Sequence, residues 1–215
     1  MGIPGEGGTL SPIPCEDEKA TRAKIADRYF RPGTELDLYV RGAPTGSFTV
    51  AAGESEEVGC QSRASGRRHG APGSTYDFIA LYPDDAVKLG PIHFPMKPQP
   101  DARAVVRLAL GDKAPGTLSL RSVRRMTDGS QQILVADVAL GSGGHAVVIA
   151  EGAGTDPTGW KAVWSDLTDG SQPALLLVDA FDLGADGHPK VLLERPKRGG
   201  ATEWILLRRD AKGWR

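Results

Sequence analysis

The chain has 215 residues, enough for one large domain or two small ones with a hydrophobic core. Its net charge is −1, from 26 basic and 27 acidic side chains, so the basic excess typical of nucleic-acid and anionic-membrane binders is missing. There is also no run of about 18 apolar residues that could span a membrane as a helix. The composition therefore predicts neither a nucleic-acid partner nor a transmembrane segment.

The first part of the chain is predicted to be an irregular arm. Residues 1–28 begin with a stretch rich in glycine and proline, and residues 16–28 are charged and support at most a short helix. The N-terminal stretch lacks the basic and apolar regions of a signal peptide.

A small β module is predicted over residues 29–97. Leu36, Leu38 and Val40 alternate with more polar residues, which is the period-2 pattern of a half-buried strand. The glycine- and proline-containing turn at 42–46 predicts a hairpin that returns through residues 48–50.

The rest of this module has weaker signals. Residues 53–75 are polar and are predicted to form a surface loop, and residues 75–82 a further strand. Residues 83–100 contain five prolines, which is typical of a linker, so we place the domain boundary near residue 98.

Residues 98–215 contain an internal repeat. Thr127-Asp128-Gly129-Ser130-Gln131 recurs 41 residues later as residues 168–172, and the apolar segment 133–141 is matched by 175–184. A fainter first copy begins with an apolar strand at 105–110. The sequence thus predicts a mainly β protein: a hairpin or barrel-like module, then about three antiparallel β-meander repeats of 41–43 residues. Convergent β-hairpin composition is the alternative explanation.

One face of these strands should form the core of the repeat domain. Strand periodicity and the repeat together select the following core residues: Ile133, Val135, Val138, Val148, Trp160, Val163, Leu175, Leu177, Leu192, Trp204 and Leu206.

The turn at residues 182–189, followed by an apolar strand, resembles a degenerate FG-GAP/VCBS-type repeat of integrin-like and bacterial exported proteins. That family carries an Asp-x-Asp-x-Asp-Gly loop that binds calcium through closely spaced carboxylates. The resemblance implies Asp182 and Asp186 as ligands, but Gly184 replaces the middle carboxylate. It therefore implies a weakened calcium site or a purely structural turn, with no other cofactor, and a periplasmic or extracellular location.

Aromatic and cysteine residues provide two further candidates. Trp160 and Trp164 are an even number of residues apart and should lie on one face of a strand, with Trp204 in a similar place in the next copy. These side chains fit the core, or a platform for a glycan or a protein partner. Cys15 and Cys60 fit a disulfide of an oxidising compartment, or two unpaired thiols.

No pattern of catalytic residues stands out. His145 and His188 follow glycines at equivalent repeat positions, Ser142 lies in a glycine-rich turn without a nucleophile-elbow setting, and Glu151 and Glu194 end equivalent strands. We therefore expect a non-enzymatic binding or structural subunit that assembles with another protein or a larger complex. The alternative is a hydrolase of glycans or esters whose acidic pair, or serine and histidine, meet only in three dimensions.

Overall fold

A computed structural model describes residues 2–4, 10–12, 27–40, 42–55, 62–70, 79–81, 89–113, 116–141, 143–184, 186–197 and 202–215. The chain divides into two compact units. Unit 1 comprises Met1–Pro91, Leu183–Asp186 and Arg198–Thr202, and unit 2 comprises Ile92–Asp182, Gly187–Lys197 and Glu203–Arg215. The first boundary between the two units along the chain, between Pro91 and Ile92, falls within the proline-rich segment.

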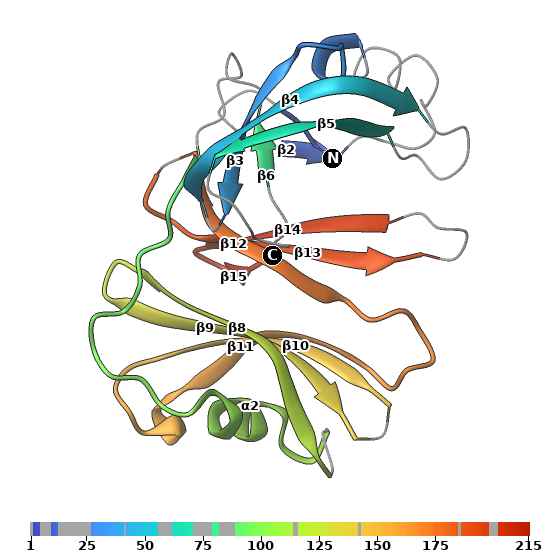
Figure 1. The fold of residues 1–215 in the computed structure, drawn as a ribbon. Helices are drawn as coiled ribbons and strands as arrows, with labels where there is room; N and C mark the ends of the chain where they lie inside the picture. The colour runs from blue at the N-terminus through green and yellow to red at the C-terminus, as the bar shows by residue number, and fades with distance from the viewer. Residues whose placement is uncertain are drawn as a thin grey trace. The chain divides into compact units, whose positions relative to one another are not determined.

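Unit 1 is built from antiparallel strands (Figure 1). Strands β1 (Gly2–Pro4) and β2 (Leu10–Pro12) pair with each other. A four-stranded sheet has the order β5-β4-β3-β6, and β7 (Leu89–Gly90) follows it along the chain. Its strands are β3 (Glu35–Val40), β4 (Ala43–Ser55), β5 (Ser62–Gly70) and β6 (Ile79–Leu81).

The predicted N-terminal hairpin is confirmed, because β3 pairs with β4 and buries Leu36 and Leu38. The predicted polar loop at 53–75 is wrong in its centre. Strand β5 pairs along β4 there, although its residues are mostly exposed and rich in arginine and glycine. This edge strand is held by its backbone pairing rather than by apolar burial, so periodicity gave no signal for it.

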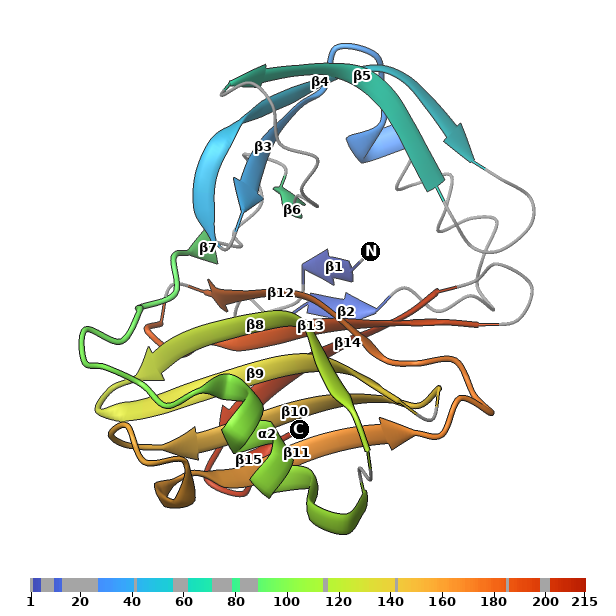
Figure 2. The same cartoon turned by 60° about the horizontal axis from the view of Figure 1, so that its bottom comes forward.

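Unit 2 contains a first four-stranded meander (Figure 2). Its strands follow one another as β8 (Leu118–Asp128), β9 (Gln131–Leu140), β10 (His145–Gly152) and β11 (Lys161–Thr168). The short 3-10 helices η2 (Gly111–Lys113) and η3 (Pro157–Gly159) lie in the connections before β8 and before β11.

A second meander of unit 2 stacks on the first. It contains β12 (Leu176–Leu183), β13 (Lys190–Pro196), β14 (Thr202–Asp210) and β15 (Gly213–Trp214), again as sequential neighbours. The predicted class, mainly β with antiparallel meanders, is confirmed.

Helix α2 (Ala102–Leu110) covers the free face of the first meander (Figure 2). The predicted strand at 105–110 is therefore wrong. Ala102, Val105, Val106 and Leu110 are all buried, and their spacing is that of one helix face rather than of a strand. The side chain of Asp101 caps the helix by accepting a hydrogen bond from the Arg103 amide at 3.0 Å.

The first meander is thus buried on both faces. On β9, Leu134, Ala136 and Val138 pack toward α2, whereas Ile133 and Val135 pack into a second cluster shared with the other meander. Two-sided burial explains why this segment reads as one continuous apolar run instead of an alternating strand. The core assignment fails at four positions. Val163 and Trp204 are each 41% exposed, and Leu192 and Leu206 are only partly buried, because Val191, Leu193 and Leu207 face the core on those strands instead.

The two copies of the Thr-Asp-Gly-Ser-Gln pentapeptide have different structural roles. Residues 127–131 form the tight hairpin between β8 and β9, where Asp128 pairs with Gln131 and Gly129 adopts a left-handed φ of 57°. Residues 168–172 instead leave β11 and cross to the second meander. The 41–43-residue repeat itself stays a prediction.

Candidate functional site

The predicted tryptophan face does not exist as a single surface. Trp160 belongs to the cluster beneath α2, whereas Trp164 packs in the cluster between the two meanders. Trp160 precedes β11, and the β10–β11 register shifts between Ile149 and Ala150. The even spacing of Trp160 and Trp164 therefore does not place their side chains on the same face of the sheet. Trp204 is exposed on β14, and its role as a binding residue stays a prediction.

Trp160 is held in place by a hydrogen bond and by close packing. Its indole Nε1 donates a hydrogen bond to the Gly154 carbonyl at 3.3 Å, and its ring lies against the Cα of Gly152. A Cβ on Gly152 would be 2.5 Å from Cγ of Trp160, so this position has no room for a larger residue.

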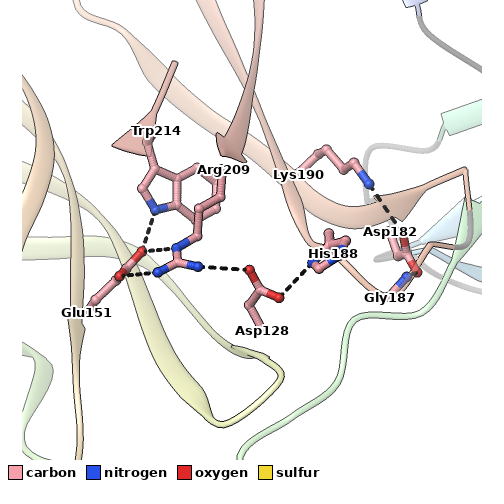
Figure 3. Close-up of polar contacts among 8 residues, drawn as sticks. All are labelled: Asp128, Glu151, Asp182, Gly187, His188, Lys190, Arg209 and Trp214. Atoms are coloured by element: carbon pink, nitrogen blue, oxygen red, sulfur yellow. Dashed lines mark hydrogen bonds and ion pairs between the residues drawn. The ribbon is translucent and has the colours of Figure 1, made fainter. Parts of the chain in front are cut away.

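The predicted calcium loop is held by contacts within the protein (Figure 3). One carboxylate oxygen of Asp182 accepts a hydrogen bond from the Gly187 amide at 2.8 Å, and the other lies 3.5 Å from Nζ of Lys190. Among the described residues, no three histidine, cysteine or acidic side chains are grouped so that they could hold a metal ion. The calcium site at Asp182 and Asp186 stays a prediction.

An arginine-centred cluster joins the two meanders of unit 2 (Figure 3). Arg209 on β14 donates from Nε and Nη2 to the two carboxylate oxygens of Glu151 on β10, at 2.7 and 3.0 Å. Its Nη1 lies 3.4 Å from Oδ2 of Asp128, at the end of β8. Trp214 donates to Glu151 at 2.8 Å, and His188 Nδ1 lies 2.8 Å from Asp128. We call these five residues the arginine clamp.

The clamp is electrostatically complementary. The hydrogen bonds from Arg209 to Glu151 raise the pKa of Arg209, and the attraction of Glu151 and Asp128 raises it too. These effects outweigh burial, which lowers the pKa. A two-point pairing of this kind fixes both partners in one geometry. Both carboxylates of the clamp therefore have a structural partner, in an arrangement suited to holding two sheets together.

A second polar contact crosses between the meanders in the interior. Asp137 on β9 lies 2.8 Å from Nε2 of His145, and both side chains are buried. The other carboxylate oxygen of Asp137 accepts a hydrogen bond from the Leu177 amide of the second meander at 3.1 Å. His145 is thus the first residue of β10 and lies inside the core.

These contacts bear on the hydrolase alternative without deciding it. His145 is buried between two meanders, and Glu151 is tied to Arg209 and Trp214. Ser142 lies outside the described residues, as do Cys15 and Cys60 with the predicted disulfide. The hydrolase and disulfide predictions therefore stay open.

An irregular segment at the start of unit 2 is fixed at both of its ends. We call residues 92–100 the strap. At one end Ile92 is buried in the cluster between the meanders, and the His93 carbonyl accepts a hydrogen bond from the Thr127 amide at 2.9 Å. At the other end Arg125 donates to the Gln99 side chain at 2.9 Å and to the Pro100 carbonyl at 3.0 Å.

The middle of the strap exposes two large apolar side chains. Phe94 is 55% exposed and Met96 is 98% exposed, and they are separated by Pro95 and followed by the exposed Lys97 and Pro98. Single exposed apolar residues are ordinary, and here two of them lie in one short segment that is tied down on either side.

Sequence reasoning identified the strap only as a proline-rich linker. Its composition contained the available signal, because phenylalanine and methionine between prolines have no strand or helix in which to be buried. The arginine clamp gave no such signal, since its members come from five separate segments of the chain.

Comparison of the chain with models of protein families, with curated protein sequences and with solved structures found no significant match. No helix in the described part of the chain is long and apolar enough to cross a membrane.

Proposed function

We propose that this protein is a non-enzymatic binding module that docks another protein through the strap. The observation that carries the proposal is the exposure of Phe94 and Met96 in a segment whose two ends are anchored to unit 2. Anchoring matters because a segment already held in place loses less conformational entropy when it binds. The prolines at 95 and 98 reduce that loss further.

The chemistry of the strap defines its occupant. Phe94 and Met96 call for an apolar groove, and a methionine side chain adapts to irregular apolar surfaces. Lys97 is exposed beside them, so the rim of the groove should be acidic. Full burial of each apolar side chain would contribute about 1.5–3 kcal/mol to binding, which is the scale of interface hot spots. The proposed partner is therefore a protein with an acidic-rimmed apolar groove.

The polar residues of unit 2 support a binding role over catalysis. Acidic side chains that could act in hydrolysis, Asp137 and Glu151, are engaged in contacts that join the two meanders. We further propose an extracytoplasmic accessory subunit, which rests on the resemblance of the turn at 182–189 and on the cysteine pair. Peptide mapping under non-reducing conditions tests that part, because linked Cys15 and Cys60 would support it.

The docking proposal is tested by co-purification of the tagged full-length chain from its native host. Three forms are compared: wild type, the double variant Phe94→Ser/Met96→Ser, and Leu108→Ser. Leu108 is the matched control because it is 55% exposed on α2, as exposed as Phe94. Thermal melting of all three forms confirms that the fold is retained.

We expect a stoichiometric partner with wild type and with Leu108→Ser, and retention reduced about tenfold or more in the double variant, since 1.4 kcal/mol is a factor of ten. Lys97→Glu should also weaken retention, and more so at low salt. Equal retention by all forms would reject the strap as the docking element. A wild-type protein that elutes alone as a monomer would reject the assembly function.

A further inference from the structure

Two of the three methionines of the chain lie in opposite environments. Met96, in the middle of the strap, is 98% exposed. Met126, on β8, is completely buried in the cluster between the two meanders. The thioether of Met96 is therefore accessible to dissolved oxidants, whereas Met126 becomes accessible only when unit 2 opens.

We propose that Met96 is a reversible oxidation site that converts the strap from an apolar to a polar surface. The oxidant is a peroxide: the thioether sulfur takes one oxygen atom from hydrogen peroxide, the O–O bond breaks, and water leaves. The reverse step belongs to a methionine sulfoxide reductase, in which two thiols are oxidised to a disulfide and the oxygen leaves as water. The product is a polar sulfoxide at the centre of the strap.

The location of Met96 makes the modification compatible with the fold. The contacts that hold the strap involve Ile92 and His93 on one side, and Gln99 and Pro100 on the other. None of them involves the side chain of Met96, which faces solvent almost completely. Oxidation of a buried methionine disrupts a core, but oxidation here changes only the character of the surface.

The consequence for binding rests on the proposed function. If the strap docks into an apolar groove, the sulfoxide places a polar group where the groove offers no hydrogen-bonding partner. Docking would then be lost under peroxide and regained after reduction, so Met96 would regulate the same surface that binds the partner.

The first arm of the test measures the modification alone. The full-length protein is exposed to hydrogen peroxide, and oxygen uptake at each methionine is followed by peptide mapping with mass spectrometry. We expect Met96 to be oxidised at least about tenfold faster than Met126 in the folded protein, and the two at similar rates in urea. A reductase should restore Met96, and the melting temperature should not change. Equal rates in the folded protein, or loss of the fold upon oxidation of Met96, would overturn the proposal.

The second arm tests regulation with Met96→Gln, which carries a polar side chain of similar length, and with Met96→Leu, which stays apolar. Co-purification should lose the partner with Met96→Gln and keep it with Met96→Leu. If both variants retain the partner, the regulatory role fails while the docking function stands. If wild type has no partner, docking and its regulation fail together, and the oxidation site is judged on the first arm.

Discussion

The guanidinium of Arg209 on β14 donates hydrogen bonds to both carboxylate oxygens of Glu151 on β10, at 2.7 and 3.0 Å. This pair therefore connects the second meander of unit 2 to the first. Trp214 adds a third hydrogen bond to the same carboxylate. The side chain of Glu151 is 12% exposed and that of Arg209 is 34% exposed, so water screens the pair in part.

Replacing Arg209 with alanine should therefore destabilise the protein. The change leaves the largely buried carboxylates of Glu151 and Asp128 without their counter-charge, and we expect a loss of about 2 kcal/mol in the free energy of unfolding. Urea denaturation measures it, with Arg208→Ala as the control, because Arg208 is an exposed arginine on the same strand that does not belong to the clamp. Similar midpoints for the two variants would show that the clamp contributes no stability.

Gly152→Ala tests the packing of Trp160. The added Cβ would lie 2.5–2.8 Å from three ring atoms of the indole, so the ring or the strand has to shift, at a cost of about 1–3 kcal/mol. Gly159→Ala is the matched control, because its Cβ would meet only the Ala153 carbonyl at 3.5 Å. The two melting temperatures should differ by several degrees, and equal values would contradict the close approach.

Asp137→Ala tests the buried contact between the meanders. It removes the acceptor of both His145 and the Leu177 amide, and leaving buried polar groups unsatisfied should cost about 2–4 kcal/mol. The exposed Asp112→Ala variant serves as the control in the same denaturation experiment. A loss no greater than that of the control would mean that the contact is energetically neutral.

Acidification should weaken the turn that carries Asp156. Hydrogen bonds from the Thr158 backbone amide, at 2.9 Å, and from the Thr158 side chain lower the pKa of Asp156 below its usual value. The depressed pKa means that this contact contributes stability above the pKa of an unfolded aspartate and loses it as the pH falls through the folded value. NMR titration should show the Thr158 amide following a midpoint below that of an ordinary aspartate. A midpoint at the ordinary value would show that Asp156 does not cap η3 through the Thr158 amide.

Calcium should bind weakly to the turn at Asp182. Lys190 supplies a positive charge 3.5 Å from one carboxylate oxygen, and the Gly187 amide engages the other. We expect a dissociation constant weaker than about 1 mM, the upper end for extracellular calcium modules, by calorimetry after chelator treatment. Lys190→Met should bind more tightly than wild type. Tight binding by wild type would restore the interpretation of this turn as a calcium loop.

The sequence allowed the β class to be predicted because strand periodicity is a local property. The alternation at Leu36, Leu38 and Val40 predicted β3, and the apolar runs around Ile133 and Val148 predicted β9 and β10. The hairpin at 127–131 has Gly129 and Ser130 as its two-residue loop, and a glycine is what such a tight loop requires.

The failures came from interactions between distant segments. The 105–110 segment is apolar enough for either a strand or a helix, and its packing on the first meander selects the helix. Strand β5 has almost no apolar signal and exists through its pairing with β4. The face of Trp160 depended on a strand boundary and a register shift that residue counting cannot foresee. The arginine clamp needs both meanders to be in place before its members meet.

The order of the strands also sets the order in which unit 2 can assemble during synthesis. Helix α2 and strands β8 to β11 leave the ribosome first, and their apolar residues facing the second meander, such as Ile133 and Val147, then have no cover. That cover is complete only when Trp214 has emerged, 63 residues after its partner Glu151. At about 5–20 residues per second, the half-finished sandwich exposes this surface for some seconds. Nascent chains stalled between β11 and β12 should accordingly bind ribosome-associated chaperones most strongly. They should also aggregate more readily than chains of any other length.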